Sequence, residues 1–265
     1  MQYLTVRDQK IHYTYNEADG KPLLVLLHGA GGNTSHFPSI LRRNTEFSSL
    51  AIDLPGHGKS EGTALNSIDL YTEFLNESIL QKNLKNFFLV GHSMGGLISQ
   101  NYILKYDHSA AGLVLMSTGA SLPVMPLILS LTKSDENQSK TAELITKIAY
   151  AKGANDALKK IGQRMLEKTS ALTMNSDFSA CNAADMTKDI ARMKLPVLIL
   201  CGDEDKMTPP KYSYYLAENI PGSELNILPN TGHMAALESP DAVLEIIMDW
   251  LKRQRRQSPA SFGIT

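Results

Sequence analysis

The chain has 265 residues, of which 43% are apolar and 20% charged, and its formal net charge is −1. This is the composition of a globular protein, and it excludes a disordered, collagen-like or wholly coiled-coil chain. The balanced charge provides no overall field to attract nucleic acid or an anionic membrane, and every apolar run is shorter than the roughly 18 residues of a membrane span.

Two cysteines, Cys181 and Cys201, are too few for a disulfide framework, and neither belongs to a Cys/His cluster typical of zinc. The first ten residues lack the apolar segment and small-residue cleavage site of a signal peptide. We therefore expect a soluble protein of a reducing compartment, most simply the cytoplasm.

Short apolar runs predict the strands. They lack apolar/polar alternation, which indicates that both faces are buried, as in a parallel sheet covered by helices. A strand pair turning at Asp8-Gln9 is expected to precede them. The predicted strands cover residues 3–6, 11–15, 23–27, 50–52, 87–90, 112–116, 197–200 and 225–228.

Helical patterns lie between these runs. Ser67 is placed to cap a helix that extends to residue 83, and Ser239 followed by Pro240 is placed to start the last helix. Two further helices are predicted over residues 94–106 and 209–220. Strands that alternate with helices predict an α/β fold with a mostly parallel central sheet flanked by helices.

The alternation of strands and helices fails over residues 118–193, which contain no convincing strand. Helical patterns occur around residues 144–150 and 158–166. We interpret this stretch as a helical insertion over a core made of residues 1–117 and 194–265. The alternative is an ordinary set of crossover helices, although some seventy residues exceed what one crossover requires.

The chain ends in a basic run, residues 252–256, and a short polar tail. Such a run can contact nucleic acid or anionic lipid. We favour the simpler interpretation, in which it is the solvated end of the last helix and matches the helix dipole.

The most informative motif is Gly91-His92-Ser93-Met94-Gly95, which directly follows a predicted strand and opens a helix. A Gly-x-Ser-x-Gly match is weak alone, but this context is that of a nucleophile on a strained turn. The flanking glycines avoid clashes, and the N–H of Met94, at a helix N-terminus, points where an oxyanion would form.

A serine hydroxyl requires a base, and the base requires an orienting carboxylate. His233 follows the predicted strand 225–228, at the edge of a parallel sheet where sites form. Three acids, Asp203, Glu204 and Asp205, follow the strand 197–200, and the residue pattern alone leaves the choice among them open.

A glycine-rich loop, His28-Gly29-Ala30-Gly31-Gly32, follows the strand 23–27 and allows close backbone approach to a ligand. It lacks the Gly-x-Gly-x-x-Gly spacing of a dinucleotide site. Residues 56–60, Gly-His-Gly-Lys-Ser, likewise lack the spacing of a phosphate loop.

The motifs occur in the order Ser93, Asp205, His233, each beyond a strand, and they resemble the α/β-hydrolase superfamily. Residues 53–60 also resemble the superfamily's Asp-x-x-Gly-x-Gly-x-Ser turn. The resemblance implies the α/β-hydrolase fold, with residues 118–193 as its lid. It makes Ser93 the nucleophile, His233 the base and Asp205 the acid that orients it.

The same resemblance places the oxyanion hole at the N–H groups of Ala30 and Met94, and substrate contacts at His28, Gly29 and Gly31. Asp53 and His57 are expected to order their turn, and His92 to have a structural role. No metal and no organic cofactor are implied.

The expected activity is hydrolysis of carboxylic esters of small to medium acids through an acyl-enzyme, with a small-molecule ester as the substrate and no nucleic acid as a partner. Lactone, thioester, amide or carbon–carbon cleavage and perhydrolysis are alternatives on this fold, as is a ligand-binding receptor that does not turn over its ligand. The sequence carries no reliable signal for an oligomer.

Overall fold

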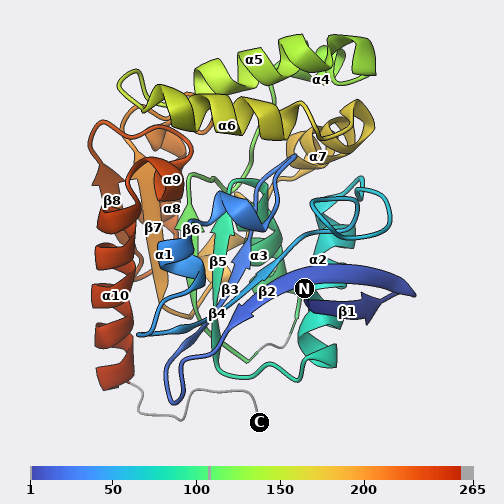
Figure 1. The fold of residues 1–265 in the computed structure, drawn as a ribbon. Helices are drawn as coiled ribbons and strands as arrows, with labels where there is room; N and C mark the ends of the chain where they lie inside the picture. The colour runs from blue at the N-terminus through green and yellow to red at the C-terminus, as the bar shows by residue number, and fades with distance from the viewer. Residues whose placement is uncertain (1, 107–108, 258–265) are drawn as a thin grey trace.

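The computed structural model describes residues 2–106 and 109–257 (Figure 1). Within this part of the chain, eight strands form one sheet in the order β1-β2-β4-β3-β5-β6-β7-β8. The β1/β2 and β2/β4 pairs are antiparallel, and the other neighbouring pairs are parallel. The strands are β1 (Gln2–Val6), β2 (Gln9–Asn16), β3 (Leu23–Leu27), β4 (Ser48–Ile52), β5 (Phe87–His92), β6 (Ala110–Met116), β7 (Val197–Gly202) and β8 (Glu224–Leu228).

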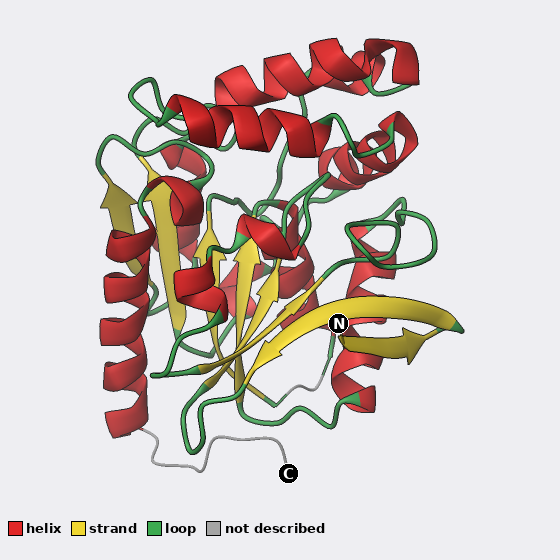
Figure 2. Cartoon of the chain, viewed as in Figure 1, coloured by secondary structure: helices red, strands yellow, loops and turns green. Residues whose placement is uncertain are grey.

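Helices cover both faces of the sheet (Figure 2). Successive residues of β3 alternate between two apolar cores: Leu23 and Val25 belong to one, Leu24 and Leu26 to the other. This explains why the strand runs show no polar face. The first core includes α2 (Ile68–Gln81), α3 (Met94–Lys105) and α8 (Pro210–Asn219), and the second includes α1 (Ser39–Arg42), α9 (Ala235–Glu238) and α10 (Pro240–Gln257).

The predicted strands all form, whereas the predicted hairpin turn is wrong by one residue. Val6 pairs with Gln9, so the turn residues are Arg7 and Asp8 rather than Asp8 and Gln9. Both have positive φ, 51° and 62°. Two-residue hairpin loops require this conformation to match the strand twist.

Ser67 caps α2 as predicted, because its side chain accepts a hydrogen bond from the N–H of Leu70. The helix ends at Gln81, two residues before the predicted end. Small shifts of this kind are common where helix ends fray.

Residues 118–193 form helices that lie over the carboxyl ends of the strands (Figure 1). The predicted helical patterns correspond to α5 (Gln138–Ala149) and α6 (Asp156–Leu166), whereas α4 (Pro126–Leu131) and α7 (Ala171–Ala183) are unpredicted. An isolated antiparallel bridge joins Ser121 to Asp185, so the two ends of this stretch meet. Short 3-10 helices occupy Thr34–His36, Asp135–Asn137 and Ile190–Arg192.

The basic run 252–256 belongs to the end of α10, where Arg253 pairs with Glu224 at 2.6 Å and Lys252 with Asp249 at 3.0 Å. The tail from residue 258 lies outside the described residues. In the described part of the chain, no helix combines the length and apolar character needed to cross a membrane.

Candidate active site

Ser93 lies between β5 and α3 in a sparsely populated backbone conformation, with φ 53° and ψ −117°. Such a conformation costs about 1–3 kcal/mol and persists only where neighbours hold it. The Ser93 N–H donates to the Met116 carbonyl at 3.0 Å, and the Thr118 hydroxyl donates to the Ser93 carbonyl at 2.8 Å. These bonds hold the serine at the sharp turn.

The glycines around Ser93 are required by close backbone approach, as the sequence predicts. A Cβ at Gly91 would collide with the backbone of Gly95, and one at Gly95 with the carbonyl of Leu27. A Cβ at Gly29 would lie 3.0 Å from the Ser93 Cβ. The glycine-rich loop therefore packs directly against the serine turn.

The structure separates the three candidate acids. Asp205 Oδ2 accepts a hydrogen bond from His233 Nδ1 at 2.9 Å, and both residues are buried. Asp203 is exposed and accepts from the Thr231 N–H at 3.3 Å, whereas Glu204 accepts from the Lys152 N–H at 2.8 Å. Of the three, it is Asp205 that contacts His233.

Asp205 has the contacts of an ionised carboxylate. Its Oδ1 accepts from the N–H groups of Met207 and Thr208 at 2.9 and 2.8 Å, and Oδ2 also accepts from the Thr208 hydroxyl at 2.7 Å. Burial alone would raise the pKa of Asp205, but the His233 ring and these hydrogen bonds hold it below its ordinary value.

The loop that carries His233 is fixed by contacts that the sequence did not reveal. The His233 N–H donates to the Ala149 carbonyl at 2.7 Å, at the end of α5. Glu238 accepts from the N–H groups of Ala151 and Gly232 at 2.8 and 3.1 Å. Burial raises the pKa of Glu238. Residues of the 118–193 stretch thus help to position His233.

The glycine-rich loop differs in part from expectation. Gly29 and Ala30 line the pocket beside Ser93. The His28 ring is fully buried and is not among the pocket-lining residues, because its Nδ1 donates to the Gly29 carbonyl and its Nε2 accepts from the Leu54 N–H. Gly31 is likewise absent from the lining, and its N–H donates to Asp177 at 2.7 Å.

The turn after β4 is ordered as expected. Asp53 accepts from the N–H groups of Thr34 and Lys59 at 2.6 and 2.9 Å and from His12 Nδ1 at 2.7 Å. His57 has a further contact, because its Nε2 donates to Asp177 at 2.7 Å.

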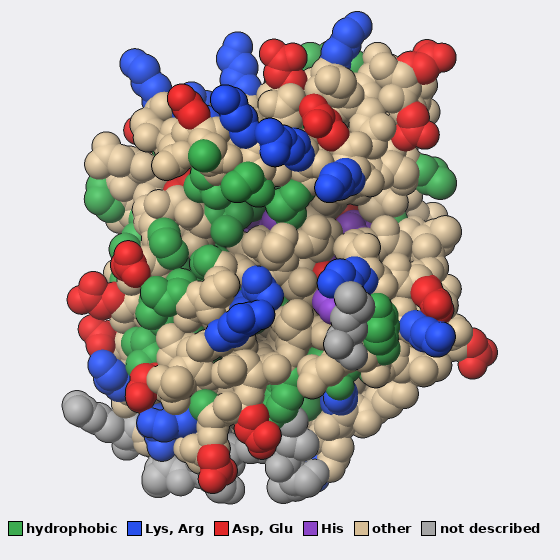
Figure 3. All heavy atoms as spheres, viewed as in Figure 1, with side chains coloured by type: hydrophobic (Ala, Val, Ile, Leu, Met, Phe, Trp, Pro, Cys, Tyr) green, Lys and Arg blue, Asp and Glu red, His purple; other side chains and the backbone are tan. Residues whose placement is uncertain are grey.

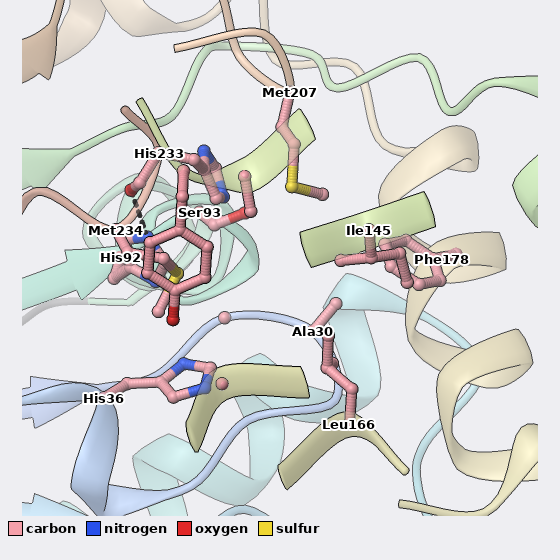
Figure 4. A pocket seen from close by; sticks show the side chains of 14 residues that line it. Ala30, His36, His92, Ser93, Ile145, Leu166, Phe178, Met207, His233 and Met234 are labelled. Carbon is pink, nitrogen blue, oxygen red and sulfur yellow. Dashed lines mark hydrogen bonds between the residues drawn. The ribbon is translucent and has the colours of Figure 1, made fainter. Parts of the chain in front are cut away.

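Two small cavities meet at Ser93. The first, which we call the histidine compartment, has a volume of about 50 Å³ and is lined by His36, His92 and His233 together with Tyr150 and Met234 (Figure 4). In this view the Ser93 and His233 side chains both point into it. Ile145, Leu166 and Phe178 close it from α5, α6 and α7.

The second cavity, which we call the Leu122 compartment, has a volume of about 70 Å³ and is apolar. Ala30, Ser93, Phe178 and Met207 border both compartments.

Hydrophobic side chains also gather on the surface between α6 and the core (Figure 3). Among the residues described here, no group of three or more His, Cys, Asp or Glu is arranged to hold a metal ion.

His92 has the structural contact expected of it, since its Nε2 donates to the His233 carbonyl at 3.0 Å, although its ring also lines the histidine compartment. Burial and the nearby His233 lower the pKa of His92 to about 3. Burial and His57 lower the pKa of His28 to about 4, and burial with His92 lowers that of His36 as well. These three rings are neutral in the folded protein.

The neutral histidines predict that the protein loses stability in mild acid. Below about pH 6.5 the unfolded chain takes up protons at these rings while the folded protein does not, so the free energy of unfolding falls as pH falls. At about 1.4 kcal/mol per pH unit, His28 and His92 each lower the free energy of unfolding by about 2 kcal/mol between pH 6.5 and 5. Urea unfolding midpoints measured across this range test the prediction.

His92→Gln is the matched variant, because its amide nitrogen reaches about as far as Nε2 and can still donate to the His233 carbonyl but does not titrate. The variant should reduce the acid-induced loss in the free energy of unfolding by about 2 kcal/mol. A midpoint that is the same at pH 7 and pH 5 would contradict the prediction.

His57 acts in the opposite sense. Burial lowers the pKa of His57, but Asp177 outweighs burial and raises it, so the contribution of His57 to the free energy of unfolding is lost as pH rises.

Residues 24–246 match the family model described as "Alpha/beta hydrolase family". The match spans most of the chain, and the protein therefore belongs to the alpha/beta hydrolase family. Lipase 1 of Psychrobacter immobilis is 28% identical over 253 residues, which cover 88% of this chain and 78% of that protein.

Solved structures agree with this assignment. A thermophilic esterase is 29% identical, with a TM-score of 0.84 and coverage of 96% of this chain and 97% of that chain. The enol-lactonase from Burkholderia xenovorans has a TM-score of 0.86 at 21% identity, over 95% of this chain and 100% of that chain, and this likeness shows the fold alone.

Proposed function

We propose that this protein is a serine hydrolase that cleaves carboxylic esters of small to medium acids. One observation supports this most strongly: Ser93, on its strained turn, borders the same pocket as His233, whose Nδ1 is bonded to Asp205. The names of two relatives, a lipase and an esterase, favour the same chemistry.

The proposed mechanism has two steps. The Ser93 hydroxyl attacks the ester carbonyl while His233 takes its proton, and the N–H groups of Ala30 and Met94 stabilise the oxyanion. His233 then protonates the departing alcohol, and water activated by His233 hydrolyses the acyl-enzyme. Asp205 holds the imidazole in the required tautomer and stabilises its charged form.

We infer the positions of the two halves of the ester from the two compartments. The alcohol oxygen must approach His233 to receive its proton, so we place the alcohol group in the histidine compartment. The acyl group then occupies the apolar Leu122 compartment. One water requires about 10–15 Å³ of cavity volume, so the Leu122 compartment, at about 70 Å³, has room for about five heavy atoms. This favours acyl groups near butyrate.

The test is hydrolysis of p-nitrophenyl acetate, butyrate, octanoate and palmitate. We expect kcat/KM to peak at butyrate and to fall about tenfold or more for palmitate, because the longer chain exceeds the compartment. The ethyl esters of the same acids are measured alongside, because their alcohol group is small enough for the histidine compartment. If neither the p-nitrophenyl nor the ethyl esters are turned over, ester hydrolysis is wrong, and lactone, thioester, amide or carbon–carbon substrates and the receptor become the better hypotheses.

A matched pair of variants checks the assignment of the compartments. Ile128 lines the Leu122 compartment and Ile145 the histidine compartment, and both are buried in one apolar cluster. Ile128→Ala should move the optimum toward octanoate, whereas Ile145→Ala should leave the acyl profile unchanged. Each substitution costs about 2–5 kcal/mol of stability, so unfolding midpoints are measured alongside. The reverse pattern would exchange the two assignments.

We also propose that residues 118–193 act as a lid on a core of residues 1–117 and 194–265. The Ser121–Asp185 bridge, which brings the ends of this segment together, supports that division. A reducing compartment such as the cytoplasm is part of the proposal, and the free, buried state of Cys181 and Cys201 supports it.

A further inference from the structure

Asp177, on α7, is a fully buried carboxylate outside the pocket lining. Its Oδ2 accepts from the Gly31 N–H and from His57 Nε2, both at 2.7 Å, and its Oδ1 accepts from the Tyr71 hydroxyl at 2.5 Å. A buried carboxylate is tolerated only when it is paired and hydrogen-bonded. These three donors satisfy that condition, and they come from three separate segments of the core.

His57 compensates the charge of Asp177. Besides its bond to Asp177, its Nδ1 faces the Pro55 carbonyl at 3.0 Å, so both ring nitrogens face acceptors. A ring that donates from both nitrogens is an imidazolium. The carboxylate is therefore neutralised by an adjacent cation and does not oppose negative charge developing in the nearby pocket.

The lid segment holds Gly31 from two sides. The Gly31 N–H donates to Asp177, and the Gly31 carbonyl accepts from the Thr169 hydroxyl at 3.0 Å. Gly31 has φ +64°, and a Cβ there would contact Met174 at 3.4 Å and Leu166 at 3.6 Å. Its left-handed conformation is thus fitted against α6 and α7.

The direction of the Gly31 N–H fixes the plane of the peptide that joins Ala30 to Gly31. That peptide shares the Ala30 Cα with the preceding one, whose N–H is the proposed oxyanion donor. Such donors stabilise a transition state only when they are already aimed at the developing charge.

We propose that Asp177 is a positioning residue, which holds the loop of residues 28–32 so that the Ala30 N–H faces the oxyanion. The proposal rests on the serine-hydrolase function above. It assigns part of the catalytic geometry to the lid segment, through a side chain that does not touch the substrate.

The experiment compares Asp177→Ala with Asn175→Ala. Asn175 lies on the same helix and donates to the Leu129 carbonyl and the Thr132 hydroxyl, both within the lid segment. Asp177→Ala removes the acceptor of the Gly31 N–H. In this variant kcat for p-nitrophenyl butyrate should fall about 100-fold with little change in KM, because a displaced donor acts on the transition state. Inhibition by a trifluoromethyl ketone, which forms a tetrahedral adduct, should weaken similarly. Asn175→Ala should match the parent.

A second readout does not depend on turnover. Hydrogen exchange of the Gly31 amide, followed by NMR, should accelerate in Asp177→Ala and not in Asn175→Ala. If the parent turns over no ester, the proposed function fails, and the Gly31 exchange rate still decides whether Asp177 anchors the loop.

Thr169→Val provides a further variant should Asp177→Ala not fold, since it removes the hydroxyl bond to the Gly31 carbonyl and keeps the side-chain shape. We expect a smaller fall in kcat, about tenfold. The proposal is overturned if Asp177→Ala loses thermal stability alone while kcat and Gly31 exchange stay at parental values. It is equally overturned if Asn175→Ala produces the same losses.

Discussion

Ser93→Ala is expected to lower kcat for p-nitrophenyl butyrate by about 10⁶, to the residual rate that binding and the oxyanion donors alone support. Without the hydroxyl no acyl-enzyme forms. The bonds that hold the turn come from the backbone of residue 93, to Met116 and from Thr118, and the variant retains them. The urea midpoint should therefore stay close to that of the parent while turnover is lost.

Ser99→Ala is the matched control. Ser99 lies on α3, is fully buried and donates its hydroxyl to the Gly95 carbonyl at 2.7 Å. This variant should keep its turnover, and a fluorophosphonate should label it at Ser93, as read by peptide mass spectrometry. If Ser93→Ala retained more than about 1% of parental kcat, another residue would be the nucleophile.

Asp205→Asn is expected to lower kcat by about 10⁴. An asparagine at this position presents an N–H to His233 Nδ1, which favours the tautomer that cannot accept the serine proton. The Asn carbonyl can still accept from the Met207 and Thr208 N–H groups, so the loop keeps its shape. Single-turnover kinetics should show that the acylation step is slowed.

Asp203→Asn distinguishes this role from a general effect of charge, because it removes one carboxylate two residues away. Asp203 is exposed and its contact is to the Thr231 N–H, so kcat should stay within about twofold of the parent. If Asp203→Asn were the damaging change and Asp205→Asn the mild one, the acid assignment would move to Asp203.

The sequence predicted the sheet well because its signal is local. A run such as residues 23–27 is apolar throughout since it faces two cores, and no tertiary information is needed to recognise it. Ser67 was recognised as a helix cap for the same reason. The hairpin turn was misplaced because Arg7, a residue that seldom has positive φ, occupies a turn position.

In the candidate site, the motifs predicted which residues come together, and tertiary contacts decided the rest. Ser93, Asp205 and His233 each follow a strand, so sheet topology brings them to one edge. His28 follows a strand too, but its ring bonds to backbone within the core. Recognising Asp177 requires knowing that α7 packs on the glycine-rich loop.

One local signal for Asp177 does exist in the sequence. Met174, Asp177 and Cys181 are spaced by three and four residues, which places the acid on the apolar stripe of a helix. All three are buried. An acid on such a stripe indicates a buried partner, although the pattern does not say which one.

The contacts of Gly31 and His233 with residues 118–193, the proposed lid, bear on how the substrate range of this protein can change. A lid that only covers a pocket can be exchanged between relatives as a module. Here Asp177, Thr169 and Ala149 hold the two loops that carry the proposed oxyanion donor and base. A chimera that imports another lid must import equivalents of these residues, or it gains a new pocket at the expense of catalytic rate. Selectivity is more safely redesigned through single side chains such as Ile128.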